Sequence, residues 1–294
     1  MSKITPFLWF EKDMKEITDF YISVFPGSKI KSTSGLDGTP SGAVEMATLE
    51  IYDLDFSLMT AGPYLKFNPT VSFIVSCDSL EELDSLWSKL SETGKVLMEL
   101  GSYPFAEKYG WVADKYGVSW QIMFSSNMKA PQKVIPTLMF AGDSCGRAEE
   151  AVNFYTSIFH NSNIGYMQKY DGSEPVDDEN AKVKHAGIMI ENFNIALMDS
   201  GKKSPLNFHQ AISFVINCET QEEIDYYWDK LTEGGKEIQC GWLNDKFGFP
   251  WQVVPTVMTR MMTTGTKEQI TRVTEAFMKM KKFDIKTLEE AFYK

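Results

Sequence analysis

The sequence predicts an α+β fold, made of one domain-sized unit repeated in tandem and a helical tail after the second copy. The stretch WVADKYGVSWQ from Trp111 returns as WLNDKFGFPWQ from Trp242, with six of eleven positions identical. The 26 residues from Thr70 likewise match the 26 residues from Ala211 at twelve positions. Self-similarity over a span of about 130 residues indicates a duplicated domain.

Each copy begins with a strand and an amphipathic helix. ITPFLWF from Ile4 is typical of a strand, and KVIPTLMF from Lys133 is its counterpart in the second copy. The next stretch spaces its apolar residues three and four positions apart, which places them on one face of a helix. These residues are Met14, Ile17, Tyr21 and Val24.

Further strands and a second helix complete the copy. The alternating stretch 43–60, with a polar turn at 52–55, predicts a β-hairpin. VSFIVS from Val71 predicts a buried strand. Ser79 and Glu82 have the spacing of a capping box, which Thr220 and Glu223 repeat, so a helix is expected to begin there in both copies.

The duplicated phrase predicts a hairpin tip. Asp114 and Gly117 take the first and fourth positions of a type I turn between two strand-like runs. Side chains alternate along the returning strand, so Gln121 points away from the larger apolar set that contains Trp120. We therefore expect Gln121 and Gln252 to face the concave side of the sheet. There each amide either orients a polar ligand or makes a structural hydrogen bond.

Composition argues against several kinds of partner. A net charge of −11 and a pI near 4.9 would repel a phosphate backbone, so no nucleic-acid partner is expected. No apolar run is as long as a membrane span or resembles a signal peptide, which favours a cytoplasmic protein without a membrane partner. The four cysteines have no CxxC spacing, so we expect free thiols rather than a disulfide framework or a zinc knot.

Three motifs have both a functional and a structural interpretation. His185 lies on an alternating strand. It is either a site residue or a strand histidine that makes a structural hydrogen bond. Cys240 would need a base to act as a nucleophile, and no histidine stands near it in the sequence, which favours a packed thiol. The loop AGDSCGR from Ala141 lacks the full spacing of a dinucleotide or adenosyl-methionine fingerprint, which argues against methyl transfer.

The copies differ most just before the duplicated phrase. Fifteen residues separate Lys95 from Trp111, but only five separate Lys236 from Trp242. The additional residues of the first copy are rich in aromatic side chains, Phe105 among them. This insertion is interpreted as a lid over a site, a cover for an edge strand, or a dimer contact.

We place the first copy at residues 1–126, a linker at 127–132, the second copy at 133–260 and a tail at 261–294. The tail has a capping box from Thr266 to Gln269 and the apolar spacing of two short amphipathic helices. Docking onto the second copy or onto a partner subunit is expected for these helices.

These motifs resemble the glyoxalase/vicinal-oxygen-chelate (VOC) superfamily, in particular its PhnB-like branch, often labelled 3-demethylubiquinone-9 3-methyltransferase-like. The resemblance covers roughly residues 4 to 255 and rests on three stretches: CGWLNDKFGFPWQVVP from Cys240, SFVINCETQEEIDYYWDKL from Ser213 and YGWVADKYGVSWQIMF from Tyr109. It implies tandem glyoxalase/bleomycin-resistance-like domains, in which pairs of βαβββ modules curl into cupped eight-stranded half-barrels. Whether modules pair within or across the copies, and whether a homodimer forms, stays open.

The resemblance also implies where a metal would bind. Metal-dependent members of the superfamily place His or Glu at four inward positions per pair of modules, on the first and last strand of each module. The matching positions here are Pro6, Ser57, Ser72, Gln121, Pro136, Ala196, Ser213 and Gln252. Hydroxyls and amides alone bind divalent ions weakly, so we expect no metal centre of the usual kind and no cofactor.

Three functions remain as hypotheses. The leading one is a metal-independent binder of a small apolar or aromatic molecule. Its candidate ligand-binding residues are Gln121, Gln252, Trp111, Trp242, Phe105 and His185. The alternative is a VOC-type isomerase, lyase or dioxygenase with a displaced metal site near His185 and Glu45, and the third is a structural or regulatory dimer whose cup has closed. The sequence names no catalytic residue.

Overall fold

A computed structural model describes residues 2–11, 13–39, 42–62, 65–127 and 130–294 of the chain. Four modules of one strand, one helix and three strands follow one another, and three helices end the chain. The first module comprises β1 (Ile4–Phe10), α1 (Met14–Val24), β2 (Lys29–Thr39), β3 (Gly42–Ile51) and β4 (Leu54–Thr60). The second comprises β5 (Val71–Ser76), α2 (Leu80–Ser91), β6 (Lys95–Tyr103), β7 (Ala106–Ala113) and β8 (Ser119–Phe124).

The second copy repeats this order. Its first module comprises β9 (Val134–Phe140), the short 3-10 helix η1 (Gly142–Ser144), α3 (Ala148–Ile158), β10 (Asn163–Lys169), β11 (Val183–Ile190) and β12 (Phe193–Asp199). The last module comprises β13 (Ile212–Cys218), α4 (Gln221–Thr232), β14 (Lys236–Glu237), β15 (Trp242–Asn244) and β16 (Pro250–Pro255). The helices α5 (Thr256–Thr264), α6 (Lys267–Phe277) and α7 (Ile285–Tyr293) follow. Within the described residues, no helix is long and apolar enough to cross a membrane.

The modules pair across the two copies. Sheet A has the strand order β14-β15-β16-β13-β1-β4-β3-β2 and combines the fourth module with the first. Sheet B has the order β10-β11-β12-β9-β5-β8-β7-β6 and combines the third module with the second. Antiparallel pairs at the two seams set Phe7 opposite Ser213 and Ser72 opposite Thr137. One chain therefore supplies both halves of each eight-stranded sheet.

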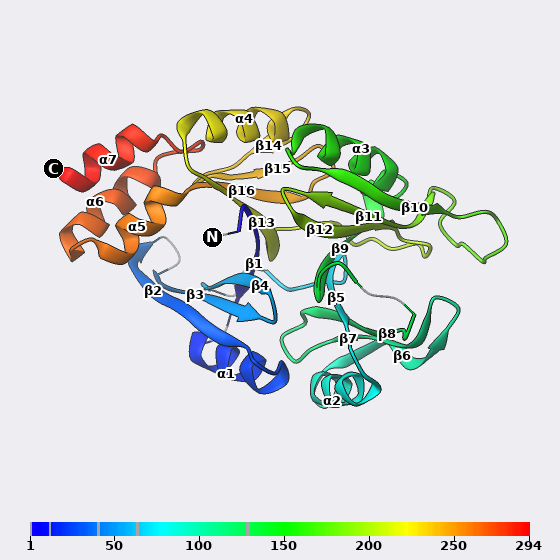
Figure 1. Cartoon of the computed structure of the whole chain (residues 1–294). Coiled ribbons are helices and arrows are strands. Elements are labelled where there is room, and N and C mark those ends of the chain that lie inside the picture. Colours follow the sequence, from blue (N-terminus) through cyan, green and yellow to red (C-terminus); the bar gives the residue numbers. More distant parts are fainter. Residues whose placement is uncertain (1, 12, 40–41, 63–64, 128–129) are drawn as a thin grey trace.

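The core lies between the two sheets and under the helices. In Figure 1 the sheets stand side by side, with α3 and α4 along one outer edge of the molecule and α1 and α2 along the other. The predicted apolar stripe of α1 is buried at every position. Phe56 of sheet A meets Phe73 of sheet B with ring centroids 5.1 Å apart, so the sheets turn these faces toward a shared core.

The duplicated phrase folds around a buried carboxylate. Asp114 accepts hydrogen bonds from the Tyr21 hydroxyl of α1 and the Trp120 indole of β8, both at 2.9 Å, and from two backbone N–H groups of its own turn. In the second copy Asp245 has the same set of donors, including the Tyr155 hydroxyl at 2.7 Å. The Asp and the second Trp of the phrase recur because they join the hairpin to the helix in each copy.

The predicted capping boxes form only in part. Ser79 Oγ accepts the N–H of Glu82 at 3.2 Å, but the Glu82 carboxylate accepts the N–H of the residue before the N-cap instead of the N-cap itself. Thr220 begins α4 in the same way. Thr266 and Gln269 make the complete reciprocal box at α6.

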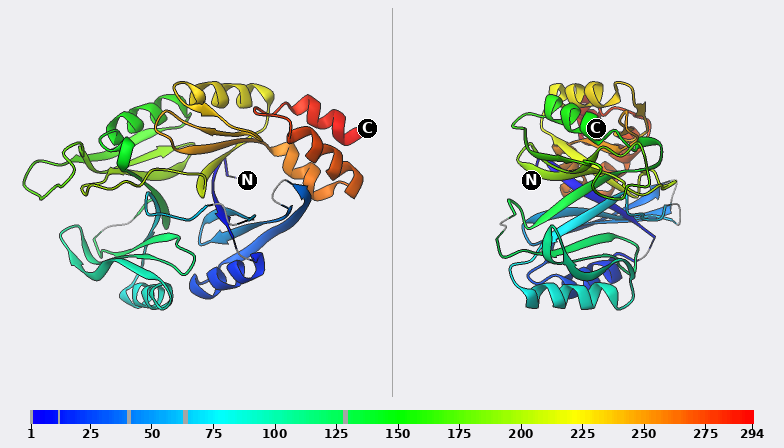
Figure 2. Two further views of the ribbon diagram at one scale, coloured as in Figure 1. Left: turned by 180° about the vertical axis from the view of Figure 1, so that it is seen from behind. Right: turned by 90° about the vertical axis from the view of Figure 1, so that its right-hand side faces the viewer.

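The tail contains the two expected helices, α6 and α7, and also the end of a third helix, α5, which begins directly after β16 and before the predicted boundary at residue 261. It lies beside the fourth module, as Figures 1 and 2 show. The backbone N–H groups of Cys240 and Gly241 donate to the carbonyls of Met280 and Lys281 at 2.8 and 2.7 Å. The tail thus pairs with the chain just before β15, whereas the second module extends the equivalent hairpin, β6–β7.

Candidate functional site

Each sheet has a second face, which points away from the shared core. On β1 the residues Ile4, Leu8 and Phe10 belong to the core, so the alternating Phe7 points to the opposite face. We name this opposite face of sheet A cup A. The corresponding face of sheet B, where Gln121 lies, is named cup B.

Pro6 and Pro136 do not face the cups, contrary to the positions carried over from the resemblance. Pro6 shares its side of β1 with the core residue Leu8, and Pro136 shares its side of β9 with the core residue Leu138. The inward residues are their neighbours Phe7 and Thr137. A shift of one residue along a strand exchanges its two faces, which is why the transfer of positions failed on these strands.

With this correction, the eight positions that hold the metal in metal-dependent relatives carry no metal ligands of the usual kind. The inward positions on the first and last strands are Phe7, Ser57, Ser213 and Gln252 in sheet A, and Thr137, Ala196, Ser72 and Gln121 in sheet B. These side chains include no imidazole or carboxylate and do not fit a divalent cation. Across the described ranges, no three His, Cys, Asp or Glu side chains gather as a metal site would require.

Cup A holds an aromatic cluster beside an amide. The Trp242 ring meets Phe7 edge-on with centroids 5.5 Å apart, and Trp9 lies 6.2 Å from Trp242. Gln252 stands opposite Trp242 in register. Its Nε2 donates to Ser213 Oγ at 3.0 Å. Gln252 is 7% exposed, yet within the described part of the chain its Oε1 accepts no hydrogen bond.

Cup B contains the same amide, but here both the nitrogen and the oxygen of the amide have partners. Gln121 Nε2 donates to Ser72 Oγ at 2.7 Å, and the Tyr109 hydroxyl donates to Gln121 Oε1 at 2.7 Å. Trp111 Nε1 donates to Ser119 Oγ at 2.6 Å. Burial raises the pKa of Tyr109, so its hydroxyl keeps its proton and remains a donor. Tyr109 is 5% exposed and fills the space beside the amide.

The aromatic insertion is a hairpin extension rather than a separate loop. Phe105 lies in the turn between β6 and β7, and its side chain is 53% exposed. Its ring lies 5.6 Å from Tyr103 and 5.0 Å from Tyr109. The extended β6–β7 hairpin therefore forms the part of cup B that contains Tyr109. A function of the insertion as a lid stays a prediction.

His185 belongs to cup B and forms a pair with Tyr166. The two rings stack with an interplanar angle of 13°, and the Tyr166 oxygen lies 2.7 Å from His185 Nδ1. Burial lowers the pKa of His185, so the imidazole is neutral near pH 7 and shares a hydrogen bond with the Tyr166 hydroxyl through Nδ1. Glu45 lies in sheet A and accepts the N–H of Met14 at 3.3 Å. The fold thus does not bring His185 and Glu45 together.

Cys240 is packed against the tail. Its thiol lies 3.8 Å from both the Phe277 carbonyl and the Met278 sulfur. Burial raises the pKa of the thiol, which disfavours the nucleophilic thiolate. The structural interpretation of this cysteine accounts for its surroundings.

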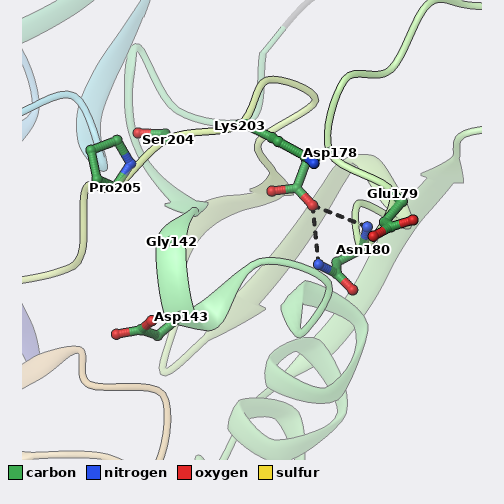
Figure 3. Close-up of a pocket in the computed structure, with 8 residues that line it drawn as sticks. All are labelled: Gly142, Asp143, Asp178, Glu179, Asn180, Lys203, Ser204 and Pro205. Atoms are coloured by element: carbon green, nitrogen blue, oxygen red, sulfur yellow. Dashed lines mark hydrogen bonds between the residues drawn. The ribbon is translucent and has the colours of Figure 1, made fainter.

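A surface hollow of about 540 Å³ lies beside the 141–147 loop, outside both cups (Figure 3). It is lined by Gly142, Asp143, Asp178, Glu179, Asn180, Lys203, Ser204 and Pro205. The Gly146 N–H of this loop donates to buried Asp199 at 2.8 Å, so it is not available to a phosphate. Because ligand sites are mostly lined by apolar and aromatic side chains, we place the candidate site in the cups instead.

The residues that distinguish the two cups were not predicted as site residues. Phe7 and Trp9 were assigned to a strand alone, and Tyr109 was only part of the stretch between Lys95 and Trp111 and of the family motif. Comparison of the two copies could have drawn attention to Tyr109, because it aligns with Cys240. Only the sheet geometry shows that Tyr109 faces cup B.

A family model described as 3-demethylubiquinone-9 3-methyltransferase matches residues 2–123 and 132–254. A PhnB protein from Bacillus cereus, described as a putative 3-demethylubiquinone-9 3-methyltransferase, is 39% identical over 42% of this chain and 100% of its own, with a TM-score of 0.39. No curated protein matches.

Two further solved structures have lower identity. Glyoxalase I from Zea mays aligns with 89% of this chain and 95% of its own at 12% identity and a TM-score of 0.60, which shows a common fold. The fosfomycin resistance protein FosX from Listeria monocytogenes covers 40% of this chain and 88% of its own at 16% identity, with a TM-score of 0.33.

Proposed function

The chain belongs to the 3-demethylubiquinone-9 3-methyltransferase family, the PhnB-like branch of the VOC superfamily, and from this premise we propose that it binds a small apolar or aromatic molecule in cup A. The binding requires no metal ion. Cup A offers the ligand aromatic walls and one amide that fixes its orientation.

The observation that carries this proposal is the free carbonyl oxygen of Gln252 next to an aromatic cluster. No described residue donates to this oxygen, so a ligand hydroxyl or amide N–H can bond it without displacing a donor of the protein. Aromatic rings add contact area and a preference for ring ligands. Phe7, Trp9 and Trp242 supply these rings around Gln252.

The chemistry of the cups favours binding over metal-assisted catalysis. The inward positions carry phenyl, hydroxyl, methyl and amide groups, which hold a neutral organic molecule better than a cation. The methyl transfer in the family's description receives no support from the 141–147 loop, because its Gly146 N–H is bonded to Asp199. We therefore assign the chain the role of a binder.

The test is a screen of small aromatic and aliphatic fragments against chelator-treated protein by ligand-observed NMR. We expect aromatic fragments to bind, and Trp242→Ala to abolish their binding because it removes the ring that both Phe7 and Trp9 contact. Trp111→Ala is the matched control, since Trp111 occupies the equivalent position in cup B. Absence of fragment binding, or binding that survives Trp242→Ala and is lost in Trp111→Ala, would refute the assignment to cup A.

A further inference from the structure

The two cups contain the same glutamine in two different states. In cup B the amide is complete, because its nitrogen bonds Ser72 and its oxygen receives the phenol of Tyr109. In cup A the nitrogen bonds Ser213 in the same manner, while the oxygen has no donor among the described residues. The Tyr109 phenol thus donates to the amide oxygen in cup B, and no described residue takes its place in cup A.

The cause lies in two substitutions between the copies. Tyr109 of the first copy aligns with Cys240 of the second, whose thiol turns to the tail helices. Ser119 aligns with Pro250, which has no hydroxyl to accept a hydrogen bond. Trp242 Nε1 therefore lacks the partner that its counterpart in cup B has, as far as the described residues extend.

Building on the proposed function, we propose that cup A takes one hydroxyaromatic ligand of the phenol class per chain. The ligand hydroxyl donates to Gln252 Oε1, as the Tyr109 hydroxyl donates to Gln121 Oε1 in cup B. Its ring lies against Trp242, and cup B takes no ligand because Tyr109 fills it.

The remaining chemistry of cup A agrees with a neutral phenol. An amide oxygen accepts a proton donor and repels an anion, so the ligand must keep its hydroxyl proton. Trp242 Nε1 offers a donor, which a hydroxyl or carbonyl oxygen of the same ligand can accept. Phe7 and Trp9 provide apolar contact for the ring.

The first experiment compares p-fluorophenol with fluorobenzene by fluorine NMR titration. These probes differ by one hydroxyl, and one added neutral hydrogen bond corresponds to about five- to tenfold in affinity. We expect that preference in the wild type and its loss in Gln252→Met, which keeps the side-chain length but has no amide oxygen. Tyr109→Phe is the control, because it changes cup B alone, and it should keep the preference.

The second experiment opens cup B. Tyr109→Ala removes the internal phenol and leaves a cavity beside Gln121, and cavities of this kind bind small aromatic molecules. We expect p-fluorophenol to raise the Tm of Tyr109→Ala by more than it raises the Tm of the wild type. Fluorobenzene should give a smaller rise, because it cannot donate to Gln121 Oε1.

The outcomes separate the ligand class from the function. If fluorobenzene binds as tightly as p-fluorophenol, if Gln252→Met keeps the preference, or if p-fluorophenol gives Tyr109→Ala no additional rise in Tm, the phenol class is wrong. If other fragments still bind in a manner that depends on Trp242, the proposed function stands and only the phenol class is wrong. If neither probe and no fragment binds, both are wrong.

Discussion

Replacing Tyr21 by Phe tests whether the buried carboxylate of the duplicated phrase holds helix and hairpin together. Asp114 is buried and accepts four hydrogen bonds, from the Tyr21 hydroxyl, the Trp120 indole and the N–H groups of Tyr116 and Val118, at 2.9 to 3.1 Å. Tyr21→Phe removes one of these donors and keeps the ring. The carboxylate then remains in the core with three donors.

The expected loss follows from the charge of the acceptor. A hydrogen bond to an ionised group contributes about 1.5–3 kcal/mol, so Tyr21→Phe should lower the free energy of unfolding by about 2 kcal/mol near neutral pH. Burial raises the pKa of Asp114 to about 6, against the lowering effect of its hydrogen bonds. At about pH 5 the carboxyl is mostly protonated, and the loss should shrink to about 1 kcal/mol, the value of a neutral bond.

The sign of the pH dependence is fixed by the direction of the pKa change. The folded-state pKa of about 6 exceeds the ordinary Asp value of 3.8. The folded state therefore binds more protons than the unfolded state between these two values. The contribution of Asp114 to stability accordingly falls as the pH rises through this window. Loss of the Tyr21 hydrogen bond raises the folded-state pKa of Asp114 further and makes this fall in stability larger.

The assay is urea unfolding of wild type and variants at about pH 7.5 and about pH 5. Tyr155→Phe should repeat the result, because Tyr155 donates to Asp245 at 2.7 Å in the second copy. Tyr103→Phe is the control, since its exposed hydroxyl bonds only a backbone carbonyl, and it should cost less than about 0.5 kcal/mol. A loss for Tyr21→Phe no larger than that of the control, or one that grows toward low pH, would contradict the reasoning.

Three further perturbations have defined outcomes. Gly110→Ala places a Cβ 2.3 Å from the Trp87 ring and should cost about 1–3 kcal/mol by overpacking, measured by urea unfolding. Asp199→Ala removes the acceptor of four backbone N–H groups at 2.8–3.1 Å. It should accelerate amide exchange at the start of α3, and unchanged exchange there would refute that role. His185 should titrate below its ordinary pKa of 6.5 in proton NMR because its ring is partly desolvated, and Tyr166→Phe should change its Nδ1 shift by removing the hydroxyl.

Much of the fold could be predicted from local patterns. The apolar stripe from Met14 to Val24 placed α1, and the alternation around the turn at 52–55 placed the β3–β4 hairpin. The inward direction of Gln121 and Gln252 followed from the same alternation, and both amides face the cups. These features depend on neighbours within a few residues in the chain, which the sequence displays directly.

Other features required the pairing of distant segments. Pro6 was assigned to a cup by analogy of position, and its true direction depends on which residues of β1 meet the core. Whether the modules pair within or across the copies depends on the seams β1–β13 and β5–β9, which join residues more than fifty positions apart. No local pattern distinguishes these seams from pairing within one copy.

The sequence by itself determined the duplication and the order of strands and helices. These are properties of residue type and spacing, and they hold whichever strands become neighbours. The tertiary structure alone decided that each sheet unites two copies, that Tyr109 satisfies Gln121, and that Gln252 Oε1 is left open. Hydrogen bonding of a side chain depends on distance and direction in space, and chain order does not specify either across a sheet.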